Sequence, residues 1–411
     1  MSDCCSAPGL MPFEQAMSKM LSAIVPITET ESISIEDGLD RVLSENICSP
    51  INVPPHNNSA MDGYAFKYEC LTMGDRLTLV GRSMAGEPYT GKVGKGECIR
   101  IMTGAKMPDD CDTVEMQENC KVEGDNIFFL ERKKEGAHVR KAGEDIHKGH
   151  IVFAKGRKLS TIDIGLLASL GIDKVNVYRK LKVALLSTGD ELKSPGEILG
   201  DGDIYESNGH ALKGVLSRLN VDVIDLGIIP DNEKLIREAF LKADEEADAV
   251  ISSGGVSVGD ADYTKDILEE LGQIGFWKIA MKPGKPFAFG KLPNSTFFGL
   301  PGNPVSALVT AHLLAVPALI KMQNCHDYEP TNLRAIATDG LKKSPGRMDF
   351  QRGVISTNGK GEVVVHTTGS QGSGILSSMS IANCYIVLPA EQGSVKAGEL
   401  VNVRLFDRYI H

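Results

Sequence analysis

The sequence has no surplus of basic residues, no regular cysteine pattern and no long apolar leader. It carries 44 Lys and Arg against 54 Asp and Glu, which gives a formal net charge of −10. A nucleic-acid-binding surface normally needs a basic stripe, so this balance argues against a nucleic-acid partner. It does not argue against an anionic ligand, because a local cluster of Lys and Arg can hold an anion on an acidic protein.

The nine cysteines are irregularly spaced, and no C-x-x-C motif occurs. An odd count without regular spacing argues against a disulfide framework and predicts a reducing, cytoplasmic location. Cys4 and Cys5 are adjacent thiols near a terminus, with no nearby His or Cys to complete a metal site. A disordered tail is therefore the better explanation of these two residues.

Apolar segments and catalytic histidine patterns are also scarce. Met1–Met20 has an acidic start and no apolar run, so no signal peptide is expected. The longest apolar stretch, Ser306–Ile320, contains His312 and Pro317 and is expected to be too short for a membrane span. The nine histidines lack metal-ligand spacing and no nucleophile elbow occurs, which argues against a structural zinc site and covalent catalysis.

What the chain does contain is glycine, 43 residues of 411, and a length that predicts two to four domains. Residues 1–50, completed by 147–180, are expected to form a helical linker domain. Residues 51–146 have short alternating runs separated by glycine turns, which predicts a small β domain. Residues 181–329 alternate strand and helix patterns, which predicts a doubly wound α/β domain. Short strands return in residues 330–411 and predict a C-terminal β-barrel-like domain.

Four individual elements illustrate the periodicity. Pro12–Val25 has apolar residues at three- and four-residue spacing and predicts an amphipathic helix. Ser34–Val42 predicts a second, short helix, and Leu159–Ala168 a third with Ser160 as its N-cap. Phe276–Met281 predicts a single strand.

Three predicted strands of the α/β domain end in glycine-rich loops, Ser187–Leu192, Ser252–Asp260 and Gly299–Pro304. Ligands of open α/β sheets bind at the carboxyl ends of strands. Glycines there allow backbone N–H groups to face an anion, and the start of the next helix adds partial positive charge. Most such loops bind nothing, yet three at one sheet edge predict a site for a phosphorylated small molecule.

Carboxylates follow the same loops at Glu191, Asp231, Asp260 and Asp262. Carboxylates beside phosphates usually indicate a bridging Mg²⁺. The alternative is that each one caps a helix or a turn, and Asp231 in particular could cap the helix after the second strand.

A lysine-rich loop lies between two later strands. Lys278, Lys282 and Lys285 surround the Pro-Gly turn of Met281–Pro286, and lysine supplies a point charge for a phosphate or another oxyanion. A solvated loop is the alternative, although the stiff Pro-Gly setting favours a ligand.

Further polar clusters lie outside the α/β domain, at Asn57–Ala65 and Arg140–Ile146 and, in the last domain, at Gly346–Gly353 and Ser370–Gly374. Each of the first two, taken alone, is best explained as a turn, and for the last two a surface turn and a ligand site are equal alternatives. The third of them places two arginines five residues apart, and arginine pairs near Ser-Gly loops suit a doubly charged oxyanion.

Together these segments resemble the MoeA family, the bacterial molybdopterin molybdenumtransferases, to which the E domain of gephyrin is related. The matching segments run in family order across nearly the whole chain: Asn58–Ala65, Ile101–Ala105, Arg140–Asp145, Ser187–Leu192, Ser253–Asp262, Met281–Pro286, Leu300–Ser306 and Gly346–Gly353. The resemblance implies an α/β domain of the molybdopterin-binding type within an elongated, four-part homodimer. It also implies a cleft between the α/β domain of one subunit and the Asp62 and Asp145 region of the other.

The implied reaction is that of a molybdenum insertase, in which molybdate enters adenylylated molybdopterin and AMP is released with the help of Mg²⁺. The candidate catalytic residues are Asp62, Asp145, Glu191, Asp231 and Asp262, and the candidate Mg²⁺ ligands are Glu191, Asp260 and Asp262. The candidate molybdate-binding residues are Arg352 and Ser373. The candidate substrate-binding residues are Thr103, Arg140, Ser187, Thr188, Gly189, Asp190, Gly254, Gly255, Ser257, Gly259, Lys278, Lys282, Lys285, Pro301, Gly302 and Pro304. A transient contact with the molybdopterin adenylyltransferase is also expected, and contact with a membrane is not.

Three alternatives remain open from the sequence. The adenylyltransferase of the preceding step consists essentially of the α/β domain, so the flanking regions argue against it. A receptor-clustering scaffold, as in gephyrin, would be expected to carry an attached domain or a long linker. A nucleotide-recycling amidohydrolase that borrows the α/β domain has no place for the segments around Asp62 and Arg352.

Overall fold

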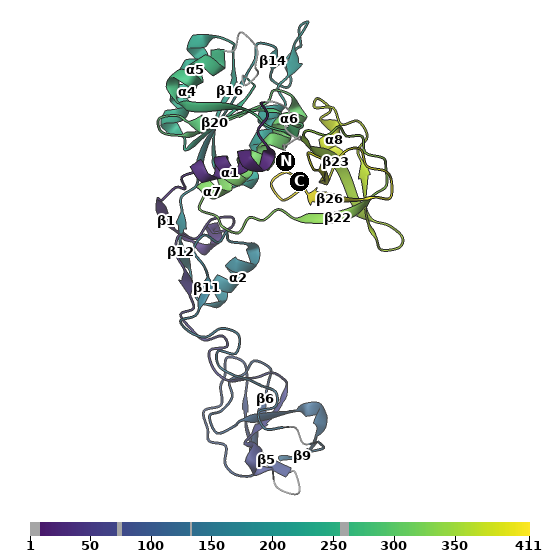
Figure 1. Ribbon diagram of the computed structural model, residues 1–411. Helices are drawn as coiled ribbons and strands as arrows, with labels where there is room; N and C mark the ends of the chain where they lie inside the picture. The colour runs from purple at the N-terminus through teal and green to yellow at the C-terminus, as the bar shows by residue number, and fades with distance from the viewer. Residues whose placement is uncertain (1–8, 72–75, 132–133, 255–262) are drawn as a thin grey trace, which may run out of the picture.

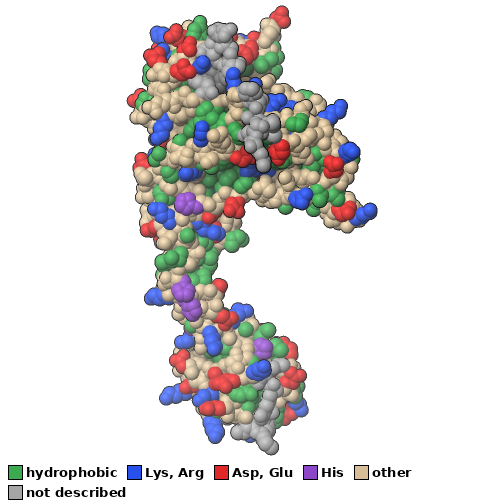
Figure 2. Space-filling model, viewed as in Figure 1, with side chains coloured by type: hydrophobic (Ala, Val, Ile, Leu, Met, Phe, Trp, Pro, Cys, Tyr) green, Lys and Arg blue, Asp and Glu red, His purple; other side chains and the backbone are tan. Residues whose placement is uncertain are grey.

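The computed structural model describes residues 9–71, 76–131, 134–254 and 263–411. Figure 1 shows an elongated chain, with an α/β domain and a β-barrel at one end and a small β domain at the other. Figure 2 shows that a narrow neck separates the small β domain from the rest of the molecule. The multi-domain α/β architecture expected from the sequence is therefore confirmed.

The α/β domain is built on a six-stranded sheet. In spatial order its strands are β16 (Asp222–Ile229), β13 (Lys182–Thr188), β17 (Ala249–Ser253), β21 (Thr296–Leu300), β20 (Pro286–Lys291) and β18 (Gln273–Lys278). The first four strands are parallel to one another. β20 runs antiparallel to them, and the edge strand β18 runs antiparallel to β20 and so in the same direction as the first four. β13 is buried along almost its whole length, as expected for a strand that is covered on both faces.

Neighbouring residues of β13 pack into different cores, because successive side chains of a strand point to opposite faces. Val183 and Leu185 belong to a core shared with α3 (Asn208–Arg218), α6 (Pro304–Thr310), α7 (Val316–Met322) and α1 (Phe13–Ala23). Ala184 and Leu186 belong to a second core shared with α4 (Glu233–Glu246) and α5 (Tyr263–Leu271). Helices therefore cover both faces, and the predicted doubly wound arrangement is confirmed.

The last helix of this domain begins at Pro304, where the missing N–H of proline costs nothing. A π-helical segment, Ala311–Ala315, separates α6 from α7 just before Pro317. Proline inside a helix lacks the N–H that the preceding turn needs, and a widened π turn is one way to accommodate it. The stretch Pro304–Met322 is long and apolar enough for a membrane span, but it is mostly buried inside the α/β domain.

The C-terminal domain is a closed barrel. Its sheet runs β19 (Met281–Lys282), β23 (Met348–Thr357), β24 (Val363–Thr367), β22 (Asn332–Ala337), β26 (Leu400–Leu405) and β25 (Cys384–Leu388), and β25 pairs again with β23. β19 comes from the α/β part of the chain and pairs in parallel with β23. The prediction of one strand over Phe276–Met281 is therefore wrong, because this stretch supplies β18 to one sheet and β19 to another.

The arm between the two ends of the molecule is formed by two short antiparallel pairs and one helix. β1 (Thr30–Ser34) pairs with β12 (Lys174–Tyr178), and β2 (Ile47–Cys48) pairs with β11 (Ile151–Phe153). The predicted N-cap Ser160 accepts from the N–H of Asp163 at 3.3 Å and begins α2 (Thr161–Ser169).

The helix predicted over Ser34–Val42 is wrong. β1 ends at Ser34, and only one 3₁₀ turn, η1 (Ile35–Asp37), follows it. Asp40 has a φ of 62°, which a continuing helix does not allow, and Leu39 is 50% exposed rather than packed on an apolar face.

The small β domain contains a third six-stranded sheet. In spatial order its strands are β7 (Thr113–Met116), β4 (Gly63–Phe66), β6 (Glu97–Ile101), β5 (Arg76–Ser83), β9 (Asn126–Phe129) and β8 (Cys120–Glu123). A separate pair, β3 (Asn58–Ser59) and β10 (Val139–Arg140), lies beside it.

An ion pair joins the arm to the α/β domain. Arg179, just after β12, donates two hydrogen bonds to Asp248, from Nη1 to Oδ2 at 2.7 Å and from Nη2 to Oδ1 at 2.8 Å. The N–H of Lys182 also donates to Asp248, at 2.8 Å. Burial alone would raise the pKa of Asp248, but the hydrogen bonds from Arg179 and Lys182 outweigh it, and the pKa lies below its ordinary value.

Replacing this carboxylate should weaken the α/β domain in a pH-dependent way. Asp248→Asn should lower the urea midpoint by the equivalent of about 1.5–3 kcal/mol, because charge-assisted hydrogen bonds are lost. The fluorescence of Trp277 in β18, the single tryptophan of the chain, reports on unfolding of this domain.

The pKa of Asp248 is lower in the folded state than in the unfolded state. The ionised carboxylate therefore stabilises the fold fully above the unfolded-state pKa of about 3.9, and this stabilisation is lost as the pH falls through the folded-state pKa. The wild type should therefore lose more stability on acidification than Asp248→Asn. Glu270→Gln, which breaks an exposed pair with Arg237, is the control and should leave the midpoint unchanged. Equal midpoints for Asp248→Asn and the wild type at pH 7 would contradict this account.

Candidate functional site

Two cavities adjoin at the edge of the α/β sheet. The first, about 630 Å³, lies at the carboxyl ends of β13, β17 and β21. The second, about 820 Å³, lies between the lysine-rich loop of the α/β domain and the C-terminal barrel. Pro286 and Asn303 line both of them. We call them the acidic cavity and the basic cavity, after the charged residues that line each.

The glycines of the strand-end loops permit close backbone approach. Gly254, directly after β17, has a φ of +90°, and a Cβ built there would lie 2.8 Å from the carbonyl oxygen of Thr188 at the end of β13. A side chain at this position would therefore clash with the neighbouring strand end as well as strain the backbone. Both residues line the acidic cavity.

The acidic cavity is lined by Glu191, Glu206 and Asp231, and none of its described lining residues is Lys or Arg. Burial, and then the negative charges of Asp190 and Glu191, raise the pKa of Asp231. The alternative role of Asp231 as a helix cap is not what the structure shows, because Asn232 caps α4 by accepting from the N–H of Leu235 at 3.2 Å. The carboxylate of Asp231 is thus left at the cavity wall.

A polar segment that the sequence analysis did not single out forms another wall of this cavity. The chain leaves β13, forms the small ribbon of β14 (Leu192–Lys193) and β15 (Ile204–Tyr205), and enters α3 through Glu206 and Asn208. The sequence could have indicated this segment, because ligand contacts are often found in a polar run directly before a helix.

Glu206 is 7% exposed and accepts from Ser187 Oγ at 3.1 Å and from the N–H of Gly209 at 2.5 Å. Ser187 therefore lies behind the wall of the acidic cavity, not on it. Asn208 Nδ2 donates to Ser253 Oγ and to the carbonyl oxygen of Gly302, both at 2.8 Å, and so ties together the loops that follow β15, β17 and β21.

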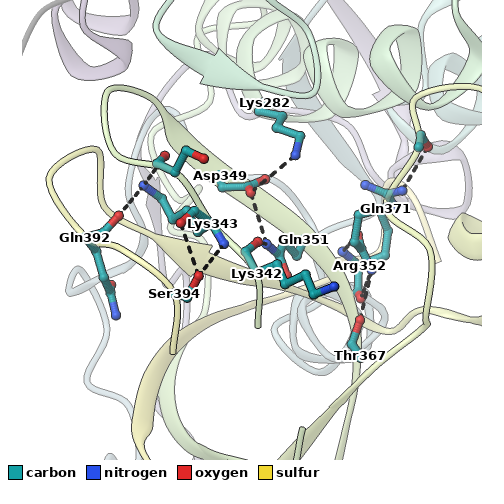
Figure 3. Close-up of polar contacts among 12 residues, drawn as sticks. Lys282, Lys342, Lys343, Asp349, Gln351, Arg352, Thr367, Gln371, Gln392 and Ser394 are labelled. Carbon is teal, nitrogen blue, oxygen red and sulfur yellow. Dashed lines mark hydrogen bonds and ion pairs between the residues drawn. The ribbon is translucent and has the colours of Figure 1, made fainter. Parts of the chain in front are cut away.

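The basic cavity is lined by four cations, Lys282, Lys285, Lys342 and Arg347, and none of its described lining residues is Asp or Glu. Figure 3 shows Lys282 reaching from the α/β domain toward Asp349 of the barrel, 3.9 Å away. Lys282, Lys285 and the candidate Ser373 are thus brought to one cavity. Lys278, at the end of β18, lines neither cavity.

The structure places Arg352 differently from the prediction that it contacts molybdate. The side chain is 1% exposed, its Nε donates to Ser378 Oγ and its Nη2 to the carbonyl oxygen of Gly372, each at 3.0 Å. It lies inside the barrel wall, because it belongs to the middle of β23. Arg347, just before β23, is the arginine that lines the basic cavity, and Arg352 fixes the loop that carries Ser373.

The remaining candidates lie at the far end of the chain or outside the described residues. Asp62 accepts from the N–H and the Oγ1 of Thr103, at 2.8 and 2.7 Å, and these bonds lower its pKa. Arg140 lies in β10, and the N–H of Asp145 donates to the carbonyl oxygen of Val53 at 3.0 Å. All of these belong to the small β domain and its neck, away from both cavities (Figure 1). The five candidates outside the described residues are Gly255, Ser257, Gly259, Asp260 and Asp262.

The donor chemistry of the acidic cavity fits Mg²⁺. Within the part of the chain that the structure describes, no group of three or more His, Cys, Asp or Glu could hold a metal ion. Mg²⁺ usually takes only one or two protein carboxylates, together with water and substrate phosphates. Glu191 and Asp231 supply carboxylates of this kind at one cavity wall.

Known proteins match the chain over nearly its full length. Residues 11–171 match the MoeA N-terminal region (domain I and II), residues 184–321 match the family described as "Probable molybdopterin binding domain", and residues 334–406 match the MoeA C-terminal region (domain IV).

Individual relatives agree with this assignment. A molybdopterin molybdenumtransferase of Haemophilus influenzae is 47% identical over 98% of this chain and 100% of that protein. The gephyrin of Dictyostelium discoideum is 32% identical over 97% of this chain but only 63% of its own length. The crystal structure of a molybdopterin biosynthesis MoeA protein from Pyrococcus horikoshii OT3 superposes with a TM-score of 0.85 at 31% identity, covering 97% of this chain and 100% of that one. The chain belongs to the MoeA family of molybdopterin molybdenumtransferases, enzymes of molybdenum cofactor biosynthesis.

Proposed function

We propose that this protein inserts molybdate into adenylylated molybdopterin and releases AMP with the assistance of Mg²⁺. The observation that carries the proposal is the pairing of an acidic and a basic cavity that share Pro286 and Asn303. The two substrates differ in a way that matches this division. One is a large nucleotide whose phosphates are bound through a metal ion, and the other is a small, doubly charged oxyanion.

The acidic cavity is the proposed site of the adenylylated pterin. Phosphates beside Glu191 and Asp231 would be repelled, so the acidic wall is consistent with a cation between them. Bound Mg²⁺ would neutralise charge on the phosphates, with Asp260 and Asp262 as further proposed ligands. The strand-end residues Thr188, Gly189, Asp190, Gly254, Gly255, Ser257, Gly259, Pro301, Gly302 and Pro304 would orient the nucleotide through their backbone groups and shape.

The basic cavity is the proposed site of molybdate. Lys282, Lys285 and Arg347 supply positive charge there, and Ser373 supplies a hydroxyl. Arg352 acts indirectly in this proposal, through the loop that it holds by Gly372. The two anions would then be held side by side at the junction of the cavities, which is the geometry that a transfer between them requires.

We further propose that the working form is a cytoplasmic homodimer. Asp62, Thr103, Arg140 and Asp145 lie at the opposite end of the chain from the cavities, so one chain does not bring them to its own cleft (Figure 1). A two-fold dimer can place the small β domain of each copy against the cleft of the other. The adenylyltransferase that supplies the substrate is a proposed transient partner.

The reaction itself can be tested with the purified chain. Incubation with adenylylated molybdopterin, Mg²⁺ and molybdate should release AMP, and omission of molybdate should slow the release. EDTA should abolish the release, and added Mg²⁺ should restore it, because the acidic wall needs a cation to hold phosphates. ATP consumption without AMP release would favour the adenylyltransferase alternative, and no turnover under any of these conditions would count against the proposal.

Replacing Arg347 should change the KM for molybdate, whereas replacing Arg352 should change the melting temperature. Arg347→Ala should raise the KM for molybdate about tenfold, the effect of losing one charge-assisted hydrogen bond, with little change in melting temperature. Arg352→Ala should lower the melting temperature by several degrees, because it removes a buried side chain from the barrel wall together with its hydrogen bonds to Ser378 and Gly372. Steady-state kinetics and thermal unfolding of both variants check this. A large KM effect of Arg352→Ala at unchanged melting temperature would restore Arg352 as a direct molybdate contact.

The shared-cleft dimer predicts complementation between inactive variants. Asp62→Ala should remove the contribution of the small β domain to the cleft, and Lys285→Ala should remove that of the basic cavity. Each variant alone should release little AMP. Mixing them under conditions of subunit exchange should recover about a quarter of the wild-type rate, because half of the dimers are mixed and each mixed dimer has one intact cleft. Each variant alone, taken through the same subunit-exchange conditions, is the control. A mixture no more active than its components would show that each chain works alone.

A further inference from the structure

Asn303 occupies the junction between the two cavities. It is the only polar side chain, among the described residues, that lines both of them, and the other shared residue is Pro286. We propose that Asn303 is a substrate-orienting residue, whose amide contacts the bound pterin nucleotide and the oxyanion where the cavities meet. The inference rests on the proposed function and gives a role to a residue of the Gly299–Pro304 loop that is not among the candidate site residues.

The local structure does not need this side chain. Asn303 is the N-cap of α6, with φ −63° and ψ 128°, a position where Asn usually accepts a hydrogen bond from the second or third N–H of the helix. No such bond is formed, and the side chain has no hydrogen-bond partner among the described residues. The start of α6 is held in other ways. Pro304 has no N–H to satisfy, and the N–H of Val305 donates to the carbonyl oxygen of Ser373 at 3.0 Å.

The backbone around Asn303 is braced from both cavities. On the acidic side, Asn208 Nδ2 donates to the carbonyl oxygen of Gly302. On the basic side, the bond between Val305 and Ser373 ties the same turn to the barrel. The amide of Asn303 is therefore exposed on a fixed turn, and a fixed group orients a ligand at a lower entropic cost than a mobile one.

The charges on the two sides explain why an amide suits this position. Lys285 and Arg347 lie on one side of it, and Glu191 and Asp231 lie on the other. An amide carries no charge and offers both a donor and an acceptor. Nδ2 can donate to an oxyanion held in the basic cavity, and Oδ1 can accept from an N–H or O–H of the pterin in the acidic cavity. A carboxylate here would repel both anionic substrates, and a lysine would pair with the acidic wall.

A purely structural role makes a different prediction from an orienting role. Asp and Asn are equally good N-caps, so Asn303→Asp should be as stable as the wild type if the residue matters only to α6. Asn303→Ala would then be the less stable and the less active of the two. The orienting role predicts the reverse order of activity, with Asn303→Asp the more damaged because its charge repels the substrates.

The experiment measures AMP release, the KM for molybdate, the KM for adenylylated molybdopterin and the melting temperature of both variants. It also measures binding of molybdate alone by calorimetry. We expect Asn303→Ala to lower kcat/KM about tenfold, as for one lost hydrogen bond, and Asn303→Asp about hundredfold, with weaker molybdate binding and an unchanged melting temperature. Ser160→Ala, which removes the cap of α2 in the arm, is the control and should lower the melting temperature without changing either KM.

The outcomes separate the two proposals. A wild type that releases no AMP overturns the proposed function, whatever the variants do. An active wild type together with an Asn303→Asp variant of unchanged kcat, KM and molybdate binding overturns the role of Asn303. Activities that follow the melting temperatures of both variants overturn it as well, because they would show that Asn303 acts only through the fold.

Discussion

The parallel pairing of β19 with β23 is the contact on which the candidate site depends. Met281 pairs with Met348 and Lys282 with Asp349, so the loop that bears the lysines is held against the barrel by backbone hydrogen bonds. The core beneath this contact is continuous, since Phe350 and Tyr385 of the barrel share it with α1 and with the last helix of the α/β domain. The basic cavity exists because these two domains meet there.

Two large buried polar side chains near this junction, His312 and Arg352, have partners, as the low dielectric of an interior favours. His312, in the π-helical segment, contacts Tyr385 OH through Nδ1 at 3.2 Å and Asp407 Oδ2 through Nε2 at 3.1 Å. Arg352 is satisfied within the barrel wall by Ser378 and Gly372. These groups hold the walls in place. The site is thus divided by sign, with carboxylates at the strand ends and cations on the barrel side.

Much of the architecture follows from local patterns. The spacing of Pro12–Val25 and the cap at Ser160 predicted helices that the structure contains, because helix periodicity and capping depend on residues only a few positions apart. The glycine-rich strand ends were predicted to meet at one sheet edge, and those that the structure describes do. The helix predicted after Ser34 failed, because Asp40 adopts a positive φ that apolar spacing does not reveal.

The sequence by itself determined the strand and helix alternation, the acidic and glycine-rich loops, and the motifs that resemble one family, since all of these are written in neighbouring residues. Only the tertiary structure decided which arginine faces the basic cavity. Arg347 and Arg352 are five residues apart and chemically identical, and a strand that begins at Met348 buries one and leaves the other at the cavity. The same holds for Glu206 and Asn303, whose places in the cleft depend on loops that come together from distant parts of the chain. Long-range packing sets these positions, and no local pattern encodes it.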